Sequence, residues 1–157
     1  MRQRPSVLNS WFRHLYAHAR GGTAGFNEAE MSILSFVLAR LSEPDRTTLA
    51  AQIQAVDLVQ RQQPGRLVVA YYRRRERVAV LPYSEYGYCL AKVKYLNRGK
   101  LRTTSLVLHD GRFMSFERNV PESEEAIESL LSVEFHPGAS PSIAKEIDRV
   151  EHANDVV

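Results

Sequence analysis

The sequence predicts an α+β fold, in which N-terminal helices pack on an antiparallel β-meander of about five strands and one or two helices follow at the C-terminal end. Apolar residues recur at helical spacing in residues 1–65, whereas residues 66–120 hold short apolar runs separated by turn residues. Residues 121–157 are acidic and return to helical spacing. With 157 residues, 44% of them hydrophobic, residues 1–157 are expected to form a single domain with its own core.

The first helix is predicted by apolar residues that recur three or four positions apart along one face. These residues are Leu8, Trp11, Phe12, Leu15 and Tyr16. Gly21 and Gly22 interrupt the pattern and predict the end of the helix. Asn27 then predicts the cap of a second helix, because Glu30 follows three residues later and completes a capping box.

The second helix carries a wide apolar stripe, which indicates a mostly buried helix. Its members are Ile33, Leu34, Val37, Leu38 and Leu41. Pro44 lies near the start of a third helix, which we expect to end at Pro64. The inner face of that helix is marked by Leu49, Ile53 and Val56.

Five short segments of residues 66–120 predict antiparallel strands. The segments are residues 67–72, 78–81, 88–96, 101–109 and 112–118. Arg98-Gly99 and Asp110-Gly111 are the turns between the last three segments, and the second turn is a strong signal for a two-residue hairpin loop.

Two-residue loops at both turns assign the strand side chains to two faces, because successive side chains alternate. Cys89 then lies opposite Leu108, on an apolar face that the N-terminal helices are expected to cover. A shift of one residue would exchange the faces. The second face is expected to be basic and polar, and it carries Lys92, Lys94, Phe116 and Arg118 with Leu90, Thr103, Ser105, Val107 and Met114.

The C-terminal part is predicted to be mainly helical. Residues 122–131 predict a short helix, residues 133–135 a short edge strand, and residues 142–151 a final helix. Acidic residues at the start of the first of these helices complement its dipole and are expected to be solvated. They are Glu122, Glu124, Glu125 and Glu128.

Charge is distributed unevenly along the chain, although the formal net charge is only +3. Residues 66–120 hold twelve Lys and Arg against four Asp and Glu, whereas residues 121–157 hold two against nine. Like charges on neighbouring strands repel, so the basic strands need an acidic cover. That cover is either the C-terminal segment of the same chain or the acidic surface of a partner.

Basic and aromatic residues interleave in the predicted strands, and this pattern favours a binding surface. Arginine and tyrosine are enriched in protein interfaces, which favours a protein partner with an acidic surface. Internal neutralisation is an equal alternative, with the C-terminal segment covering Lys92 and Lys94 in part. Single-stranded nucleic acid is a third interpretation, because it binds through phosphate contacts and base stacking. The residues predicted to bind the partner are Tyr72, Arg73, Arg74, Arg75, Arg77, Lys92, Lys94, Phe116 and Arg118.

No residue pattern predicts catalysis, a metal or another cofactor. Cys89 and His109 are a candidate nucleophile and base, but the predicted register points them to opposite faces. His14 and His18 share a helix face, yet two ligands are fewer than the four of a structural zinc site. Asp110 is explained as a turn residue, and next to His109 on a strand it is expected to point away from it.

These observations favour a non-catalytic protein-binding module. Small binding proteins without catalytic residues include inhibitors, adaptors and the immunity proteins that neutralise bacterial toxins, and immunity is our specific hypothesis. A nucleic-acid-binding domain is the alternative, followed by an enzyme with an unrecognised site. A single cysteine and the lack of an apolar run of about 18 residues predict a cytoplasmic protein without membrane contact.

Overall fold

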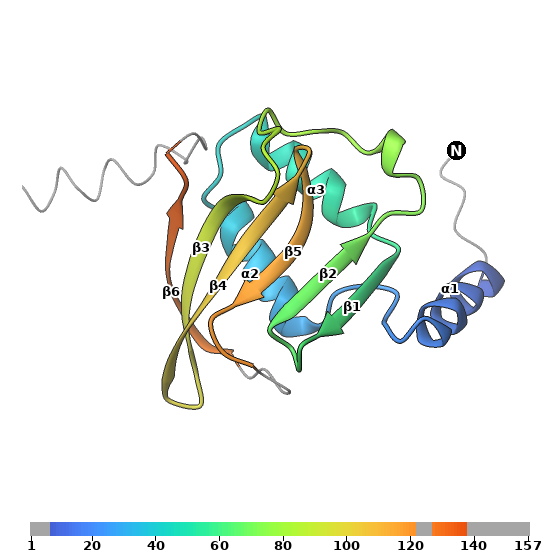
Figure 1. Ribbon diagram of the computed structural model, residues 1–157, viewed down its shortest axis with the longest axis horizontal. Coiled ribbons are helices and arrows are strands. Elements are labelled where there is room, and N and C mark those ends of the chain that lie inside the picture. Colours follow the sequence, from blue (N-terminus) through green and yellow to red (C-terminus); the bar gives the residue numbers. More distant parts are fainter. Residues whose placement is uncertain (1–6, 122–126, 138–157) are drawn as a thin grey trace, which may run out of the picture.

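The computed structural model describes residues 7–121 and 127–137, and these form three helices and a six-stranded sheet (Figure 1). The strand order is β1-β2-β5-β4-β3-β6, and every neighbouring pair is antiparallel. The α+β class is therefore confirmed, but the sheet is not a meander, because β2 pairs with β5. The strands are β1 (Leu58–Gln62), β2 (Leu67–Tyr71), β3 (Tyr88–Asn97), β4 (Lys100–His109), β5 (Arg112–Arg118) and β6 (Ile127–Phe135). The helices are α1 (Val7–Ala19), α2 (Glu28–Leu38) and α3 (Asp45–Gln54), with a short 3-10 helix, η1 (Arg75–Arg77).

The third helix is shorter than the spacing predicts, because part of the predicted helix is a strand. α3 ends at Gln54, and the chain then enters β1. β1 pairs with β2 along its whole length, and its Leu58 and Val59 are buried. Sheet pairing and burial therefore override the local helical spacing at this point.

The C-terminal part also differs from the prediction. Residues 127–131 are predicted as helical but belong to β6, which pairs with β3 and also contains the predicted edge strand at residues 133–135. Residues 78–81 form no strand. Residues 122–126 and the predicted helix at residues 142–151 lie outside the described residues.

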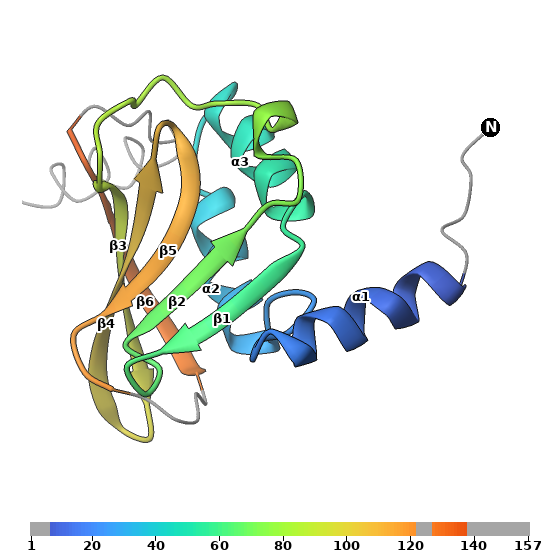
Figure 2. The same ribbon diagram turned by 45° about the vertical axis from the view of Figure 1, so that its right-hand side comes forward.

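α2 and α3 cover one face of the sheet, whereas α1 projects from the β1 side in both views (Figures 1 and 2). The predicted capping box of α2 is present, since Asn27 Oδ1 accepts the Glu30 N–H (2.8 Å) and Glu30 Oε2 accepts the Asn27 N–H (2.9 Å). The sheet residues of this covered face include Val59, Val68, Val93, Tyr95, Leu106, Leu108, Phe113 and Phe116. The opposite side, here called the open face, carries Val69, Tyr71, Lys92, Lys94, Ser105, Val107 and Glu117.

A β-bulge in β3 shifts the predicted register. Cys89 pairs with Val107 and Ala91 with Leu106, so Leu90 is an extra residue. A bulge of this kind reverses which face the preceding residues occupy. Cys89 consequently lies on the open face, and its predicted place on the covered face was wrong.

A second irregularity, between β4 and β5, moves two residues of the predicted binding set. Leu108 pairs with Phe113 as predicted, but Met114 is then an extra residue. Beyond it, Phe116 and Arg118 lie on the covered face, where their exposed fractions are 0% and 7%. Their predicted place on the basic, open face was wrong for the same physical reason as that of Cys89.

Candidate partner-binding surface

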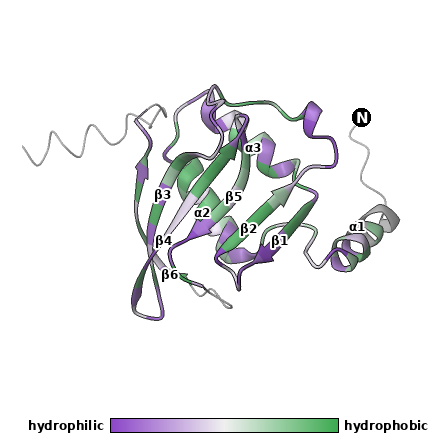
Figure 3. Ribbon diagram, in the orientation of Figure 1, coloured by the Kyte–Doolittle hydropathy of each residue, from purple (hydrophilic) through white to green (hydrophobic). Residues whose placement is uncertain are grey.

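Residues 73–77, here called the arginine segment, gather four of the predicted binding residues. The segment follows β2 and ends in η1. All four of its arginines are exposed, and so is Glu76, which lies between Arg75 and Arg77. Figure 3 shows η1 as a hydrophilic turn at the edge of the molecule. A short segment thus presents several guanidinium groups to solvent.

The backbone of the arginine segment is held at both ends. The Arg73 N–H donates to Asp57 Oδ2 at 2.9 Å. The N–H groups of Arg77 and Val78 donate to the carbonyl oxygens three residues earlier, at 3.0 and 3.1 Å. These hydrogen bonds fix the backbone conformation of the segment, from which the arginine side chains project.

Gln52 of α3 anchors the chain immediately after the arginine segment. Its fully buried side chain donates from Nε2 to the carbonyl oxygens of Ala79 and Gly111, both at 2.8 Å, and accepts the Phe113 N–H at 2.9 Å. The Leu81 N–H also donates to the Gly111 carbonyl at 2.8 Å. A Cβ at position 111 would collide with the Leu81 carbonyl oxygen, and the positive φ of this residue also favours glycine.

Arg75 is tied to the β4–β5 turn. Its Nη2 donates to the His109 carbonyl (3.2 Å) and lies 3.3 Å from Asp110 Oδ2. Arg112 Nε donates to the Val78 carbonyl at 3.2 Å, from the other side of the turn. Asp110 Oδ2 also lies 3.5 Å from His109 Nε2, so the expectation that Asp110 points away from His109 was wrong. Asp110 reaches back because its φ of 50° places it in the left-handed region of the turn.

The other three arginines of the segment are unpaired within the described part of the chain. The guanidinium groups of Arg73, Arg74 and Arg77 form no ion pair with a described residue. They border a solvent-open hollow of about 300 Å³, which is lined by Ala55, Asp57, Arg73, Arg74, Arg77 and Val78. Their donors are available to an anionic group of a ligand or partner.

The remaining predicted binding residues lie elsewhere. Tyr72 turns inward, its hydroxyl donates to the Phe113 carbonyl at 2.6 Å, and burial raises its pKa. Lys92 and Lys94 lie on the open face of β3, as predicted. Lys94 Nζ is 2.7 Å from Glu134 Oε1 of β6, so the acidic C-terminal part covers Lys94, in line with the expected partial internal cover.

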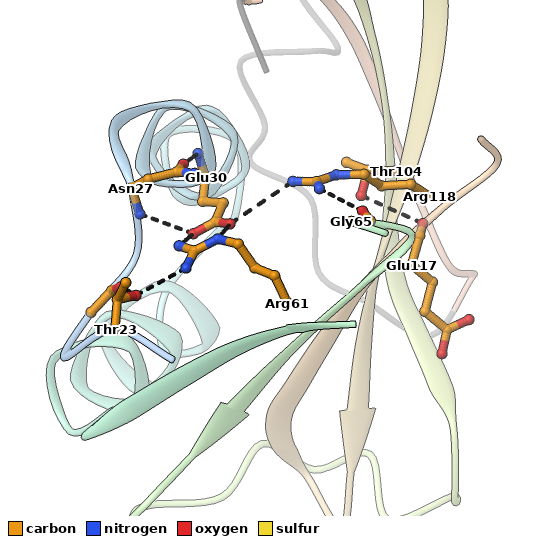
Figure 4. Close-up of polar contacts among 9 residues, drawn as sticks. Thr23, Asn27, Glu30, Arg61, Gly65, Thr104, Glu117 and Arg118 are labelled. Atoms are coloured by element: carbon orange, nitrogen blue, oxygen red, sulfur yellow. Dashed lines mark hydrogen bonds and ion pairs between the residues drawn. The ribbon is translucent and has the colours of Figure 1, made fainter. Parts of the chain in front are cut away.

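Arg118 belongs to a buried ion-pair cluster that the sequence does not reveal (Figure 4). Glu30 is fully buried, and its carboxylate accepts two hydrogen bonds from Arg61, from Nε at 2.8 Å and from Nη2 at 2.7 Å. Arg118 Nη2 lies 4.0 Å from Glu30 Oε1, and its Nη1 donates to the Gly65 carbonyl at 2.7 Å. The cluster ties α2 to β1 and β5, so Arg118 is enclosed rather than presented to a partner.

Cys89 and His109 lie on the same face of the β3–β4 pair, contrary to the prediction, because of the bulge at Leu90. Even so, the two side chains form no hydrogen bond with each other. Cys89 Sγ donates to the Ala91 carbonyl (3.7 Å), and the His109 ring packs edge-on against Tyr86 with centroids 4.4 Å apart. The pair thus lacks the nucleophile–base contact of a catalytic site.

Other site types and other proteins provide no further guide. Across residues 7–121 and 127–137, no three His, Cys, Asp or Glu side chains gather closely enough to hold a metal ion. None of the described helices combines the length and the apolar character needed to cross a membrane. No family model, curated protein or solved structure matches the chain.

Proposed function

We propose that this chain is a non-catalytic binding protein whose arginine segment docks onto an acidic surface of another protein, as an inhibitor or a toxin-neutralising immunity protein would. The observation that carries this proposal is the group of unpaired guanidinium groups of Arg73, Arg74 and Arg77 on a backbone held at both ends. A loop already held in one conformation loses little conformational entropy on binding. Arginine is also one of the residue types that dominate interface energies.

The distribution of acidic side chains supports an external partner for this segment. Lys94 forms an ion pair with the carboxylate of Glu134, and Arg75 forms one with that of Asp110. The three remaining arginines form no ion pair with a described carboxylate, although Asp57 lines the same hollow and accepts the Arg73 backbone N–H. Internal neutralisation therefore accounts for the open face better than for the arginine segment.

The burial of the aromatic residues favours a protein over nucleic acid. A single-stranded nucleic acid stacks its bases on exposed aromatic side chains of a sheet. Tyr88, Tyr95 and Phe116 are all buried, although they supply much of the aromatic pattern in the strands. Tyr71 on the open face and Tyr86 in the loop before β3 are the exposed aromatic side chains of this pattern, at 39% and 79%. Two exposed rings on separate elements are a weak basis for base stacking across the sheet.

Charge reversal at two of the unpaired arginines tests the proposal. The tagged full-length chain, expressed in cells of its own organism, is purified as wild type, as R74E/R77E and as R66E/K100E. The last variant reverses two exposed basic residues outside the segment and changes the net charge equally. Each purification is done with and without nuclease, and bound proteins are identified by mass spectrometry.

The proposal predicts a stoichiometric protein that survives nuclease and the R66E/K100E change but is absent from the R74E/R77E purification. Loss of the bound material with nuclease would instead identify a nucleic-acid-binding domain. A protein retained equally by both variants would place the interface outside the arginine segment and overturn the proposal.

A further inference from the structure

The open face of the sheet is apolar at β2, although no described helix lies over it (Figures 1 and 2). Val68 and Ala70 of β2 are buried on the face that the helices cover. Leu67, Val69 and Tyr71 lie on the open face, where the first two are half-buried and Tyr71 is 39% exposed. A strand that is apolar on both faces is typical of a sheet covered on both sides. This composition indicates that the open face receives a cover.

Two exposed charges of opposite sign lie on this face without a counter-ion. The register places Lys92 of β3, Ser105 of β4 and Glu117 of β5 in one row across the sheet. Neither Lys92 nor Glu117 forms an ion pair or a side-chain hydrogen bond with a described residue, and Figure 4 shows the Glu117 carboxylate pointing away from the buried ion-pair cluster. Two strand spacings, about 10 Å, separate them. Both charges are therefore open to a group from outside.

These charges restrict what covers the open face. An acidic surface, such as that of the partner proposed for the arginine segment, is repelled by Glu117, and so are the phosphates of a nucleic acid. A second copy of this chain carries both signs. In a two-fold symmetric dimer, residue i of one copy meets residue j of the other, and j meets i. A two-fold axis along β4, above Ser105, places Lys92 of each copy opposite Glu117 of the other. One symmetric contact then pairs both charges in both copies.

We propose that the open face is the interface of a homodimer, in which two sheets pack face to face with Lys92 opposite Glu117 of the second copy. Facing sheets lie about 10 Å apart with their strands nearly aligned, a spacing that a lysine and a glutamate side chain bridge together. Because β4 is the fourth strand of the six across the sheet, the same axis lays β2 of each copy over β6 of the other. The apolar residues of β2 are then removed from solvent. The arginine segment is not part of this interface.

The mass of the full-length chain in solution tests the inference. Sedimentation equilibrium at protein concentrations from about 5 to 200 µM should show a reversible dimer. K92E places like charges opposite each other twice in the dimer, and so does E117K, so each should raise the dimer dissociation constant at least about tenfold. K100E changes the net charge as K92E does, at an exposed position beside the β3–β4 turn, and should stay within about twofold of wild type.

The double variant K92E/E117K separates the pairing of charges from net charge. It has the net charge of the wild type, and each substituted position again faces the opposite sign in the second copy. Its dimer dissociation constant should therefore return to within about threefold of wild type. R74E/R77E should dimerise as wild type does, because the arginine segment lies outside the interface. Far-ultraviolet circular dichroism confirms that each variant is folded.

Four results would overturn the inference. The first is a wild-type chain that stays monomeric over the whole concentration range, as expected if another protein or another part of the chain covers the open face. The second is equal weakening in K92E and K100E, which would mean that only net charge matters. The third is a K92E/E117K variant that stays as dissociated as the single variants. The fourth is loss of the dimer in R74E/R77E, which would place the contact at the arginine segment.

Discussion

Two arginine clusters of this domain have opposite surroundings. Arg61 and Arg118 converge on the buried carboxylate of Glu30, where helix α2 meets β1 and β5 (Figure 4). Arg74 and Arg77 leave the arginine segment into solvent and meet no carboxylate among the described residues. The residue type is the same in both clusters. The placement of one acidic side chain decides whether arginine holds the fold together or remains available for binding.

We therefore expect substitutions in the two arginine clusters to change the free energy of unfolding by different amounts. A buried ion pair adds little net stability compared with an apolar replacement, but removing one partner leaves an uncompensated charge in the interior. An exposed arginine without a partner contributes little to folding in either direction. The following predictions test this contrast, from the largest expected effect to the smallest.

The largest effect is expected for Glu30→Gln. Glutamine retains an acceptor for the Asn27 N–H, so the capping box is preserved while the negative charge is lost. Arg61 and Arg118 then lack their buried counter-ion, and we expect the free energy of unfolding to fall by about 3 kcal/mol. Urea denaturation measures this loss.

The matched control is Glu43→Gln. Glu43 pairs with Arg46 at 2.8 Å, but the two side chains are 51% and 45% exposed. The expected loss of stability is small, because solvent screens an exposed ion pair. Equal losses in the two variants would contradict the claim that burial separates the clusters.

The second prediction concerns the support of the arginine segment. Gln52→Leu keeps the side chain's approximate volume but removes three hydrogen bonds, two to carbonyl oxygens and one from a backbone N–H. We expect a loss of about 2 kcal/mol, together with faster hydrogen exchange in residues 73–81. Gln54→Leu, an exposed position on the same helix, should change stability by less than about 0.5 kcal/mol. Unchanged exchange in the Gln52→Leu variant would show that Gln52 does not hold the segment.

Tyr72→Phe should have an intermediate effect of about 1 kcal/mol, because it removes the hydroxyl bond to the Phe113 carbonyl. Burial raises the pKa of Tyr72, so the neutral phenol is the form that the fold favours. Its contribution is therefore complete below the pKa of an unfolded tyrosine, about 10, and is lost as the pH rises further. Burial also raises the pKa of Tyr88, so alkaline absorbance titration should show one fewer late-ionising tyrosine in Tyr72→Phe than in wild type. Identical titration curves would contradict the burial of this hydroxyl.

The smallest effect on folding is expected for R74E/R77E. Both side chains are exposed, so urea denaturation should give a free energy of unfolding within about 0.5 kcal/mol of wild type. A loss as large as that of Glu30→Gln would mean that these arginines have a structural role, and the contrast between the clusters would disappear.

Local signals in the sequence predict those elements that local geometry determines. Asn27 with Glu30 correctly places the start of α2. Arg98-Gly99 and Asp110-Gly111 correctly place two hairpin turns, because all four residues adopt the positive φ that a tight hairpin turn of this type requires. The α+β class follows from these elements together with the two kinds of apolar spacing.

Features that depend on distant residues are not encoded in such local signals. The alternation of apolar and polar residues does not reveal that Leu90 and Met114 are extra residues. Each nevertheless reverses the sheet face on which the strand residues to one side of it lie. Glu30 is predicted only as a cap, although its carboxylate also meets Arg61, 31 residues away. For the binding surface, the four arginines are predictable from sequence, but their support by Gln52 and Asp57 is not, because it depends on how α3 and β2 pack.

The affinity of the two charge-reversal variants for the recovered partner protein tests the central claim most directly. Titration calorimetry at fixed salt compares R74E/R77E with R66E/K100E, whose net charges are equal. Hot-spot arginines are worth about 2 kcal/mol or more, so R74E/R77E should bind at least about thirtyfold more weakly than wild type, while R66E/K100E should stay within about threefold. Equal weakening in both variants would mean that the arginine segment contributes only net charge, and it would contradict the account of residues 73–77 as a preformed binding surface.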